Sequence, residues 1–191
     1  MEELLLEFKF SESYGKVFPL FAKQSLMNEG LLSNDPDDAG GATIFGISKV
    51  FWRKDYKIVK ALWDAGKYME ALEYAVDFYY RNFYTTYLER IPIDTAYRTF
   101  DFGINAGLKK SVKFLQRTVN QINKIEKSYG AKIYVDGVFG MQTVNAINKV
   151  PSSLLLYNYK KRLEEYYRTR KKFWKFGKGW LKRLNRKLRK G

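Results

Sequence analysis

The chain of 191 residues contains no histidine and no cysteine. It therefore cannot form Ser-His-Asp or Cys-His nucleophile pairs, or the His-ligated zinc site of a wall amidase. Because there is no cysteine, disulfides are excluded, and the composition carries no sign of the redox compartment. Any enzyme with this composition has to work with carboxylates, hydroxyls, Lys, Arg, Tyr and backbone dipoles.

Long apolar runs are also missing. No segment reaches the roughly 18 apolar residues that a membrane-spanning helix needs, and the acidic start, residues 1–7, has too short an apolar run for a secretory signal. We therefore expect synthesis in the cytoplasm of the host cell without a signal peptide. The chain is 46% hydrophobic and 17% aromatic, a composition that predicts a packed globular protein.

Charge is unevenly distributed along the chain. Residues 160–191 contain fifteen Lys or Arg and two Glu, so this segment carries +13 of the total net charge of +15. The rest of the chain is close to neutral. A basic tail with Trp180, Leu184 and Leu188 at helical spacing predicts adhesion to anionic envelope polymers or lipids, although a solvated charged helix gives the same pattern.

The hydrophobic periodicity is mainly helical. The turn-rich stretch at residues 31–48, with a short strand at 43–45, predicts one small β-hairpin. We therefore expect a mainly α fold with a small β part: a helical bundle with one small β-hairpin. The helices are expected at residues 18–29, 56–65, 68–84, 93–102, 111–125, 143–148 and 154–173.

The most informative stretch follows the first of these helices. Glu29 ends an apolar helix, a loop with Asp35, Asp37 and Asp38 follows, and Thr43 lies on the short strand. Two carboxyl groups and a positioned water are what glycosidic bond cleavage requires. Asp35 and Asp37 compete with Asp38 for the second carboxylate role, and an Asp in such a loop also serves to cap turns.

Several motifs of the sequence resemble glycoside hydrolase family 108, the phage and bacterial muramidases that cleave peptidoglycan. The resemblance covers most of the chain except residues 49–90, and one departure is Leu31-Leu32, where the family has Gly-Tyr. The matching motifs are Glu29-Gly30, Asn34-Asp35-Pro36 with Asp38, Gly40-Gly41-Ala42-Thr43, Phe45-Gly46-Ile47, Phe100-Asp101 through Asn105-Ala106-Gly107, Leu115-Gln116 with Asp136-Gly137 and Gly140, and Gly179-Trp180 with Arg183.

The resemblance implies a mainly α, lysozyme-like α+β fold, with the β-hairpin next to the active-site cleft. It also implies an endolysin-like N-acetylmuramidase that hydrolyses the β-1,4 bond between N-acetylmuramic acid and N-acetylglucosamine, for host-cell lysis. Glu29 would be the general acid, and Asp38 and Thr43 would hold the water. Asp101 and Asn105, four residues apart on one helical face, would contact the glycan, although Asp101 equally suits a bracing role in the core. No cofactor and no metal are expected.

The motifs divide the chain at residue 108. Residues 1–108 would form the catalytic region, and residues 109–191 a peptidoglycan-binding-like helical region with the basic tail, packed on the first. We expect a monomer whose partner is peptidoglycan and which binds no nucleic acid, since no exposed base-stacking motif is visible. The alternatives are a lytic transglycosylase, a non-catalytic wall-binding protein and a nucleic-acid-binding protein.

Overall fold

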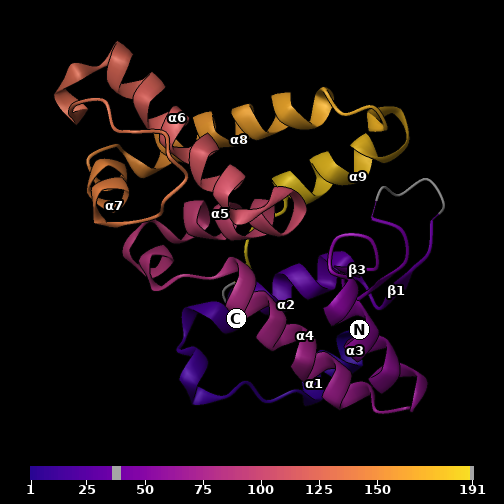
Figure 1. Ribbon diagram of the computed structural model, residues 1–191. Coiled ribbons are helices and arrows are strands. Elements are labelled where there is room, and N and C mark those ends of the chain that lie inside the picture. The colour runs from indigo at the N-terminus through magenta and orange to yellow at the C-terminus, as the bar shows by residue number, and fades with distance from the viewer. Residues whose placement is uncertain (36–39, 190–191) are drawn as a thin grey trace. The chain divides into compact units, whose positions relative to one another are not determined.

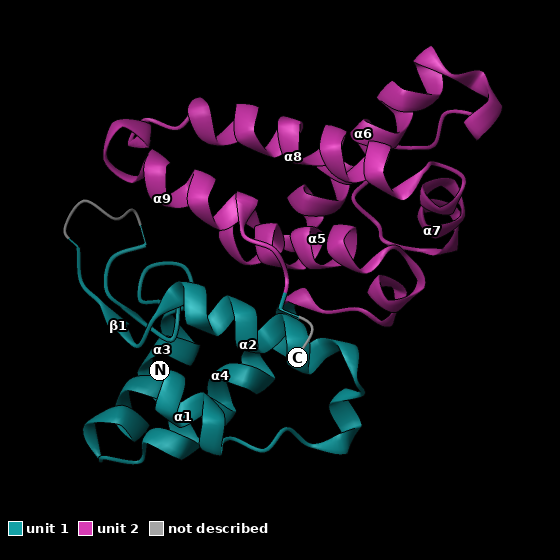
Figure 2. Cartoon of the chain, turned by 180° about the vertical axis from the view of Figure 1, so that it is seen from behind, with its two compact units in different colours: residues 1–82, 189–191 teal, residues 83–188 magenta. Residues whose placement is uncertain are grey.

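The computed structural model describes residues 1–35 and 40–189. The chain forms two compact units, which are coloured separately in Figure 2. Unit 1 comprises residues 1–82 and 189–191, and unit 2 comprises residues 83–188. The expected mainly α fold with a small β element is confirmed. Within the described ranges no helix is both long and apolar enough to cross a lipid bilayer. The functional division expected at residue 108 stays a prediction.

Unit 1 consists of helices and a small antiparallel sheet whose strand order is β1-β2-β3 (Figure 1). The sheet therefore contains one strand more than the expected hairpin. Its elements are α1 (Glu2–Glu7), a 3₁₀ turn (Glu12–Tyr14), α2 (Val17–Glu29), β1 (Leu32–Ser33), β2 (Thr43–Ile44), β3 (Ile47–Ser48), α3 (Arg53–Asp64) and α4 (Tyr68–Phe83), the last residue of which belongs to unit 2.

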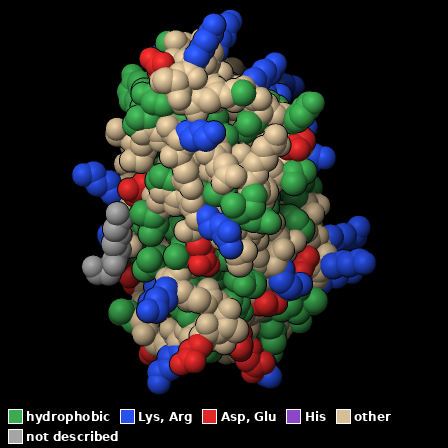
Figure 3. Space-filling model, turned by 90° about the vertical axis from the view of Figure 1, so that its left-hand side faces the viewer, with side chains coloured by type: hydrophobic (Ala, Val, Ile, Leu, Met, Phe, Trp, Pro, Cys, Tyr) green, Lys and Arg blue, Asp and Glu red, His purple; other side chains and the backbone are tan. Residues whose placement is uncertain are grey.

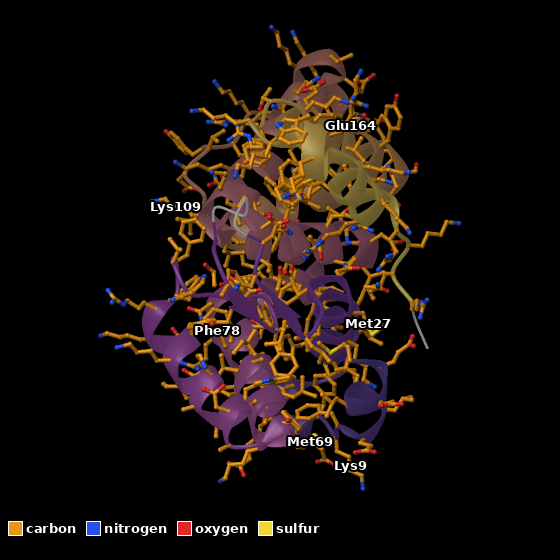
Figure 4. The ribbon with its side chains drawn as sticks, turned by 90° about the vertical axis from the view of Figure 1, so that its right-hand side faces the viewer. Lys9, Met27, Met69, Phe78, Lys109 and Glu164 are labelled. Carbon is orange, nitrogen blue, oxygen red and sulfur yellow. The ribbon has the colours of Figure 1, made fainter. Side chains whose placement is uncertain are left out.

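The core of unit 1 is aromatic. Phe18 and Phe21 of α2 are fully buried, and Phe78 of α4, labelled in Figure 4, is 1% exposed. The ring of Phe18 contacts that of Tyr80 edge to face, with the centroids 4.9 Å apart. Such pairs add to the free energy of burying their area. The core thereby fixes α2 against α4, and the end of α2 carries the candidate acid.

The turn between β2 and β3 is unusually tight. Ile44 pairs with Ile47, so Phe45 and Gly46 form a two-residue turn. Both have positive φ, +50° and +76°, as a type I′ hairpin turn requires. The predicted strand of residues 43–45 therefore ends at Ile44. The buried ring of Phe45 packs edge-on against Trp63 of α3 at 5.6 Å, which holds a non-glycine residue in this conformation.

The described residues of unit 2 form helices and loops and no strand, and α5, α6, α8 and α9 pack together (Figure 1). Tyr159, fully buried, contacts Ser111 through its hydroxyl at 3.0 Å and so joins α8 to α6. The elements are a 3₁₀ turn (Thr86–Arg90), α5 (Ile93–Ala106), α6 (Leu108–Ile125), a 3₁₀ turn (Lys127–Tyr129), α7 (Met141–Asn148), α8 (Ser152–Arg168) and α9 (Phe173–Asn185).

The single long helix expected at residues 154–173 is wrong, because α8 ends at Arg168 and α9 begins at Phe173. The hydroxyl of Thr169 donates to the carbonyl of Tyr166 at 2.8 Å, which competes with the helical ladder. The following basic residues, 170–172, add like-charge repulsion along a helix. The break lets α9 fold back so that Trp180 stacks on Tyr167, with centroids 5.7 Å apart and planes 29° apart.

Candidate active site

Glu29 is the last residue of α2 and is half-buried. The helix ends there because Gly30 has a φ of +76° while its N–H still donates to the carbonyl of Leu26. A glycine after the last helical residue is the usual way to stop a helix. The turn at Gly30 sends the chain directly into β1, which places Glu29 beside the small sheet of unit 1.

The carboxyl group of Glu29 lies against the backbone of the hairpin turn. A β-carbon built on Gly46 would lie 2.7 Å from the Cγ of Glu29 and 2.9 Å from its Oε2. It would lie only 2.5 Å from the Oη of Tyr79. No real side chain fits at these distances, so Gly46 is required both by its positive φ and by the space that Glu29 and Tyr79 occupy.

Tyr79, on α4, fixes the turn from the other side. Its side chain is fully buried, and its hydroxyl donates to the carbonyl oxygen of Phe45 at 2.7 Å. The glutamate, the turn and the phenol therefore form one packed group within unit 1. We call Glu29, Phe45, Gly46 and Tyr79 the acid cradle.

Sequence reasoning missed Tyr79, because its helix carries no motif. The one signal that could have indicated a partner was Phe45-Gly46, because the carbonyl group of a buried turn needs a hydrogen-bond donor.

Thr43 lies on β2, half-buried, where it pairs with Ser33 on one side and Ser48 on the other. It is therefore on the strand that leads directly into the acid cradle. Asp38, the predicted second carboxylate, and its competitor Asp37 lie outside the described residues. The other competitor, Asp35, is described and half-buried.

The far end of the aspartate loop is tied to the sheet by Ser48. Its hydroxyl donates to the carbonyl of Gly40 at 2.6 Å and accepts the N–H groups of Val50 and Phe51. This fixes the point at which the chain returns from the loop to the sheet. No three acidic residues gather into a metal site anywhere in the described ranges.

Asp101 and Asn105, the predicted glycan contacts, lie on α5 in unit 2. Asp101 is 3% exposed, and its carboxylate accepts from Arg183 Nε at 3.0 and 3.1 Å and from Nη2 at 2.9 Å. Arg98 lies 3.8 Å away and the hydroxyl of Tyr97 3.3 Å away. Asn105 is exposed and donates to the backbone carbonyl of Asp101. The glycan contacts of Asp101 and Asn105 stay predictions. The hydrogen bonds that Asp101 accepts from Arg183 support its bracing role in the core of unit 2.

Arg98 completes this arrangement by capping the end of α9. Its guanidinium donates to the carbonyl of Arg183 at 3.0 Å and to that of Arg186. The last carbonyls of a helix lack internal partners, and a cation satisfies both their hydrogen bonding and the helix dipole. Two motifs that are far apart in sequence, around Asp101 and around Arg183, are thus one buried ionic cluster in unit 2. The sequence alone did not link them.

The third motif, Gln116 with Asp136-Gly137, also meets in space. Gln116 Nε2 lies 2.8 Å from Asp136 Oδ1 and 3.1 Å from Thr143 Oγ1, and its Oε1 accepts the N–H of Gly137 at 2.9 Å. The hydrogen bond from Gln116, and after it the one from the N–H of Val138, lower the pKa of Asp136. Gly137 has a φ of +80°, and a β-carbon there would lie 2.7 Å from the backbone oxygen of Lys109, labelled in Figure 4. The polar groups of this motif hold the fold of unit 2.

Residues 22–107 match the family model described as Glycosyl hydrolase 108, a range that includes the acid cradle and α5. Among solved structures the chain is similar to Brucella abortus SagA, with 26% identity, a TM-score of 0.62, and coverage of 86% of this chain and 88% of that one. No curated protein matches the chain.

Proposed function

Since residues 22–107 form a glycosyl hydrolase 108 domain, which implies a glycosidase acting on peptidoglycan, we propose that the chain is an N-acetylmuramidase. It would hydrolyse the β-1,4 bond between N-acetylmuramic acid and N-acetylglucosamine. The observation that carries the proposal is the acid cradle, in which the Glu29 carboxyl group lies against Gly46 in a hairpin turn that the phenol of Tyr79 holds from the other side.

In this mechanism Glu29 protonates the glycosidic oxygen of the leaving sugar. A general acid has to be held within hydrogen-bonding reach of that oxygen, and the cradle restricts the rotamers that Glu29 can adopt. The second carboxylate holds the attacking water and accepts its proton as general base, while the water oxygen forms the new bond to the sugar carbon. We assign that role to Asp38, with Asp35 as the described competitor.

Thr43 supports the attacking water from β2, which begins three residues before Gly46, the end of the hairpin turn. An inverting enzyme needs the two carboxyl groups about 6.5–9.5 Å apart so that a water fits between them. A lytic transglycosylase also uses one glutamate but needs no water, so the aspartate and threonine together favour hydrolysis. Products with free reducing ends would distinguish hydrolysis from the anhydro-sugar of a transglycosylase.

The experiment that tests the proposal compares wild type with Glu29→Gln on purified peptidoglycan, by loss of turbidity and by assay of new reducing ends. The amide keeps the shape of the side chain but cannot donate the acid proton, so activity should fall by about 10²–10⁴-fold. Glu12→Gln, an exposed carboxylate on a 3₁₀ turn of the same unit, serves as the control. Activity within about tenfold of wild type in a folded Glu29→Gln protein would refute the assignment.

The basic tail supports a further part of this proposal, adhesion to anionic polymers of the envelope. Leu184 and Leu188 are buried, so the apolar stripe packs on the protein and is not presented to lipid. The side chains of Lys182, Lys187 and Arg189 are exposed. On the face drawn in Figure 3, Lys and Arg side chains are spread over the surface, with apolar, neutral and some acidic side chains between them. We therefore assign adhesion to charge alone, acting after cytoplasmic synthesis and release to the wall during host lysis.

A further inference from the structure

Three amides of α6 hold the loop that follows it. Asn120 Nδ2 donates to the carbonyl of Ile133 at 2.8 Å and its Oδ1 accepts the N–H of the same residue. Asn123 Nδ2 donates to the carbonyl of Ala131 at 3.1 Å. With Gln116, these side chains are spaced four and three apart, on one stripe of the helix. The loop is therefore fixed along α6 before any ligand arrives.

The neighbouring stripe of α6, one residue further on, faces a hollow of about 710 Å³. This is within the range of small-molecule sites, about 300–1,000 Å³. We call it the α6 hollow. It is lined by Arg117, Asn120, Gln121, Asn123, Lys124, Lys132, Val135 and Arg162, which come from α6, from the loop and from α8.

The charge of the α6 hollow is of one sign. Four of the lining residues, Arg117, Lys124, Lys132 and Arg162, are basic, and none is acidic. In the described part of the chain no carboxylate forms an ion pair with any of the four. Unpaired cations around one concave surface repel one another, and an anionic ligand relieves that repulsion.

Arg162 is already held in position. Its Nε donates to Thr118 Oγ1 at 3.1 Å, and its Nη2 donates to Gln121 Oε1. Burial lowers the pKa of Arg162; Glu165 on the same helix raises it, and the charge of Arg117 lowers it again. A guanidinium has five N–H donors, so the two bonds leave others to contact a ligand oxygen.

One residue that lines the α6 hollow, Asn123, carries a buried acceptor without a donor. Asn123 is 5% exposed, and among the described residues its Oδ1 has no hydrogen-bond partner. A buried acceptor left in this state costs free energy that a ligand hydroxyl would recover. The ligand should therefore combine a multiply charged anion with at least one hydroxyl group.

From these observations we propose that the α6 hollow binds a phosphate group carried by a sugar or polyol. The phosphate contacts the guanidinium of Arg162 and the ammonium groups of Lys124 and Lys132, and a hydroxyl of the carrier donates to Asn123 Oδ1. Phosphate suits the site better than a single carboxylate, because it offers more acceptor oxygens and more charge to four cations. This site does not depend on the muramidase proposal.

The test is a titration of the full-length protein at low salt, by calorimetry, with glycerol 1-phosphate and glucosamine 6-phosphate as probes. Inorganic phosphate, methyl phosphate and glycerol are the reference compounds. The polyol and sugar phosphates should bind about tenfold tighter than methyl phosphate, which lacks the hydroxyl, and glycerol should not bind. Equal binding of methyl phosphate would overturn the role of Asn123, and no saturable binding of any phosphate would overturn the site.

Charge variants distinguish direct contacts in the α6 hollow from the long-range electrostatic attraction of the whole protein. Lys124→Gln with Lys132→Gln should weaken binding about tenfold or more, because two direct contacts are lost. Lys178→Gln with Lys187→Gln removes the same charge from exposed positions of unit 2 outside the hollow, and should change binding by less than about twofold. An equal loss in both double variants would mean that only long-range attraction is at work, and would sink the proposal.

Two further arms identify the source of the ligand. A poly(glycerol phosphate) chain that binds more tightly than its monomer would assign a wall polymer, and equal binding would assign free sugar or polyol phosphates. A short single-stranded oligonucleotide that binds more tightly than either would overturn the polyol assignment in favour of nucleic acid.

Discussion

Replacing Gly46 by alanine tests the acid cradle most directly. The new methyl group would lie 2.5 Å from Tyr79 Oη and 2.9 Å from Glu29 Oε2, in a residue whose φ is +76°. The left-handed backbone conformation costs an alanine about 1–2 kcal/mol, and crowding a packed site adds about 1–3 kcal/mol. We therefore expect Gly46→Ala to lower the free energy of unfolding by about 2–5 kcal/mol in all.

The substitution should also reduce catalysis in molecules that remain folded. The methyl group can be accommodated only if the Glu29 carboxyl group moves, and a displacement of about 1 Å in a reacting group costs about 100-fold in rate. The measurements are urea denaturation and initial rates on peptidoglycan well below the thermal transition. Glycan-cleaving activity within about threefold of wild type would refute the reasoning that the cradle positions the acid.

Gly66 provides the matched control. It has a φ of +72° in the same unit, and nothing lies within 4 Å of the position its β-carbon would take. Gly66→Ala should therefore cost about 1 kcal/mol from the backbone alone and leave activity unchanged. Tyr79→Phe, made in the Gly46→Ala protein, removes the nearest clashing atom, so the two substitutions together should cost about 1 kcal/mol less than their sum.

Three further predictions concern the rest of the chain. Arg183→Gln leaves Asp101 buried without its main partner and should cost about 3 kcal/mol of stability, measured by urea denaturation, whereas Lys182→Gln on the same helix should cost almost nothing. Burial raises the pKa of Tyr159 to about 12. Its contribution to stability is therefore complete below the unfolded value of about 10 and is lost, by about 3 kcal/mol, as pH rises toward 12, a loss that Tyr159→Phe should abolish in alkaline unfolding curves. Asp38→Ala should reduce peptidoglycan hydrolysis far more than Asp37→Ala, because only one loop carboxylate faces the water; a larger loss in Asp37→Ala would reassign the role.

Sequence reasoning located the helices and the end of α2 well, because both depend on local signals. Apolar spacing predicted a helix at residues 18–29, and α2 spans Val17–Glu29, with Gly30 ending it. Phe45, the first residue of the hairpin turn, was predicted to be the last residue of the strand at 43–45, because an aromatic residue has high strand propensity. Its positive φ is imposed by tertiary contacts, with Trp63 and with the hydroxyl of Tyr79.

The residues that meet across unit 2 could not be paired from sequence for a related reason. Asp101 and Arg183 are 82 positions apart, and although a bracing role in the core was one expectation for Asp101, nothing in the sequence identified Arg183 as its partner. Only the break between α8 and α9 brings them together, and the basic composition around that break gave no helix-stop signal of the Gly or Pro kind.

The ionic cluster of unit 2 has a consequence for how the protein is made. A ribosome delivers Asp101 and Arg98 long before Arg183, which lies near the end of α9. Until Arg183 emerges, the Asp101 carboxylate on α5 lacks its main counter-ion. Burying this carboxylate in unit 2 without a counter-ion costs free energy.

The acid cradle meets no such delay, because residues 1–82 contain all of it. We therefore expect the nascent chain to order its candidate catalytic group first and to complete its second unit only when the last turn of α9 is released. A chain interrupted before residue 183 would have an incompletely folded unit 2, and we expect it to be degraded faster than the full-length protein.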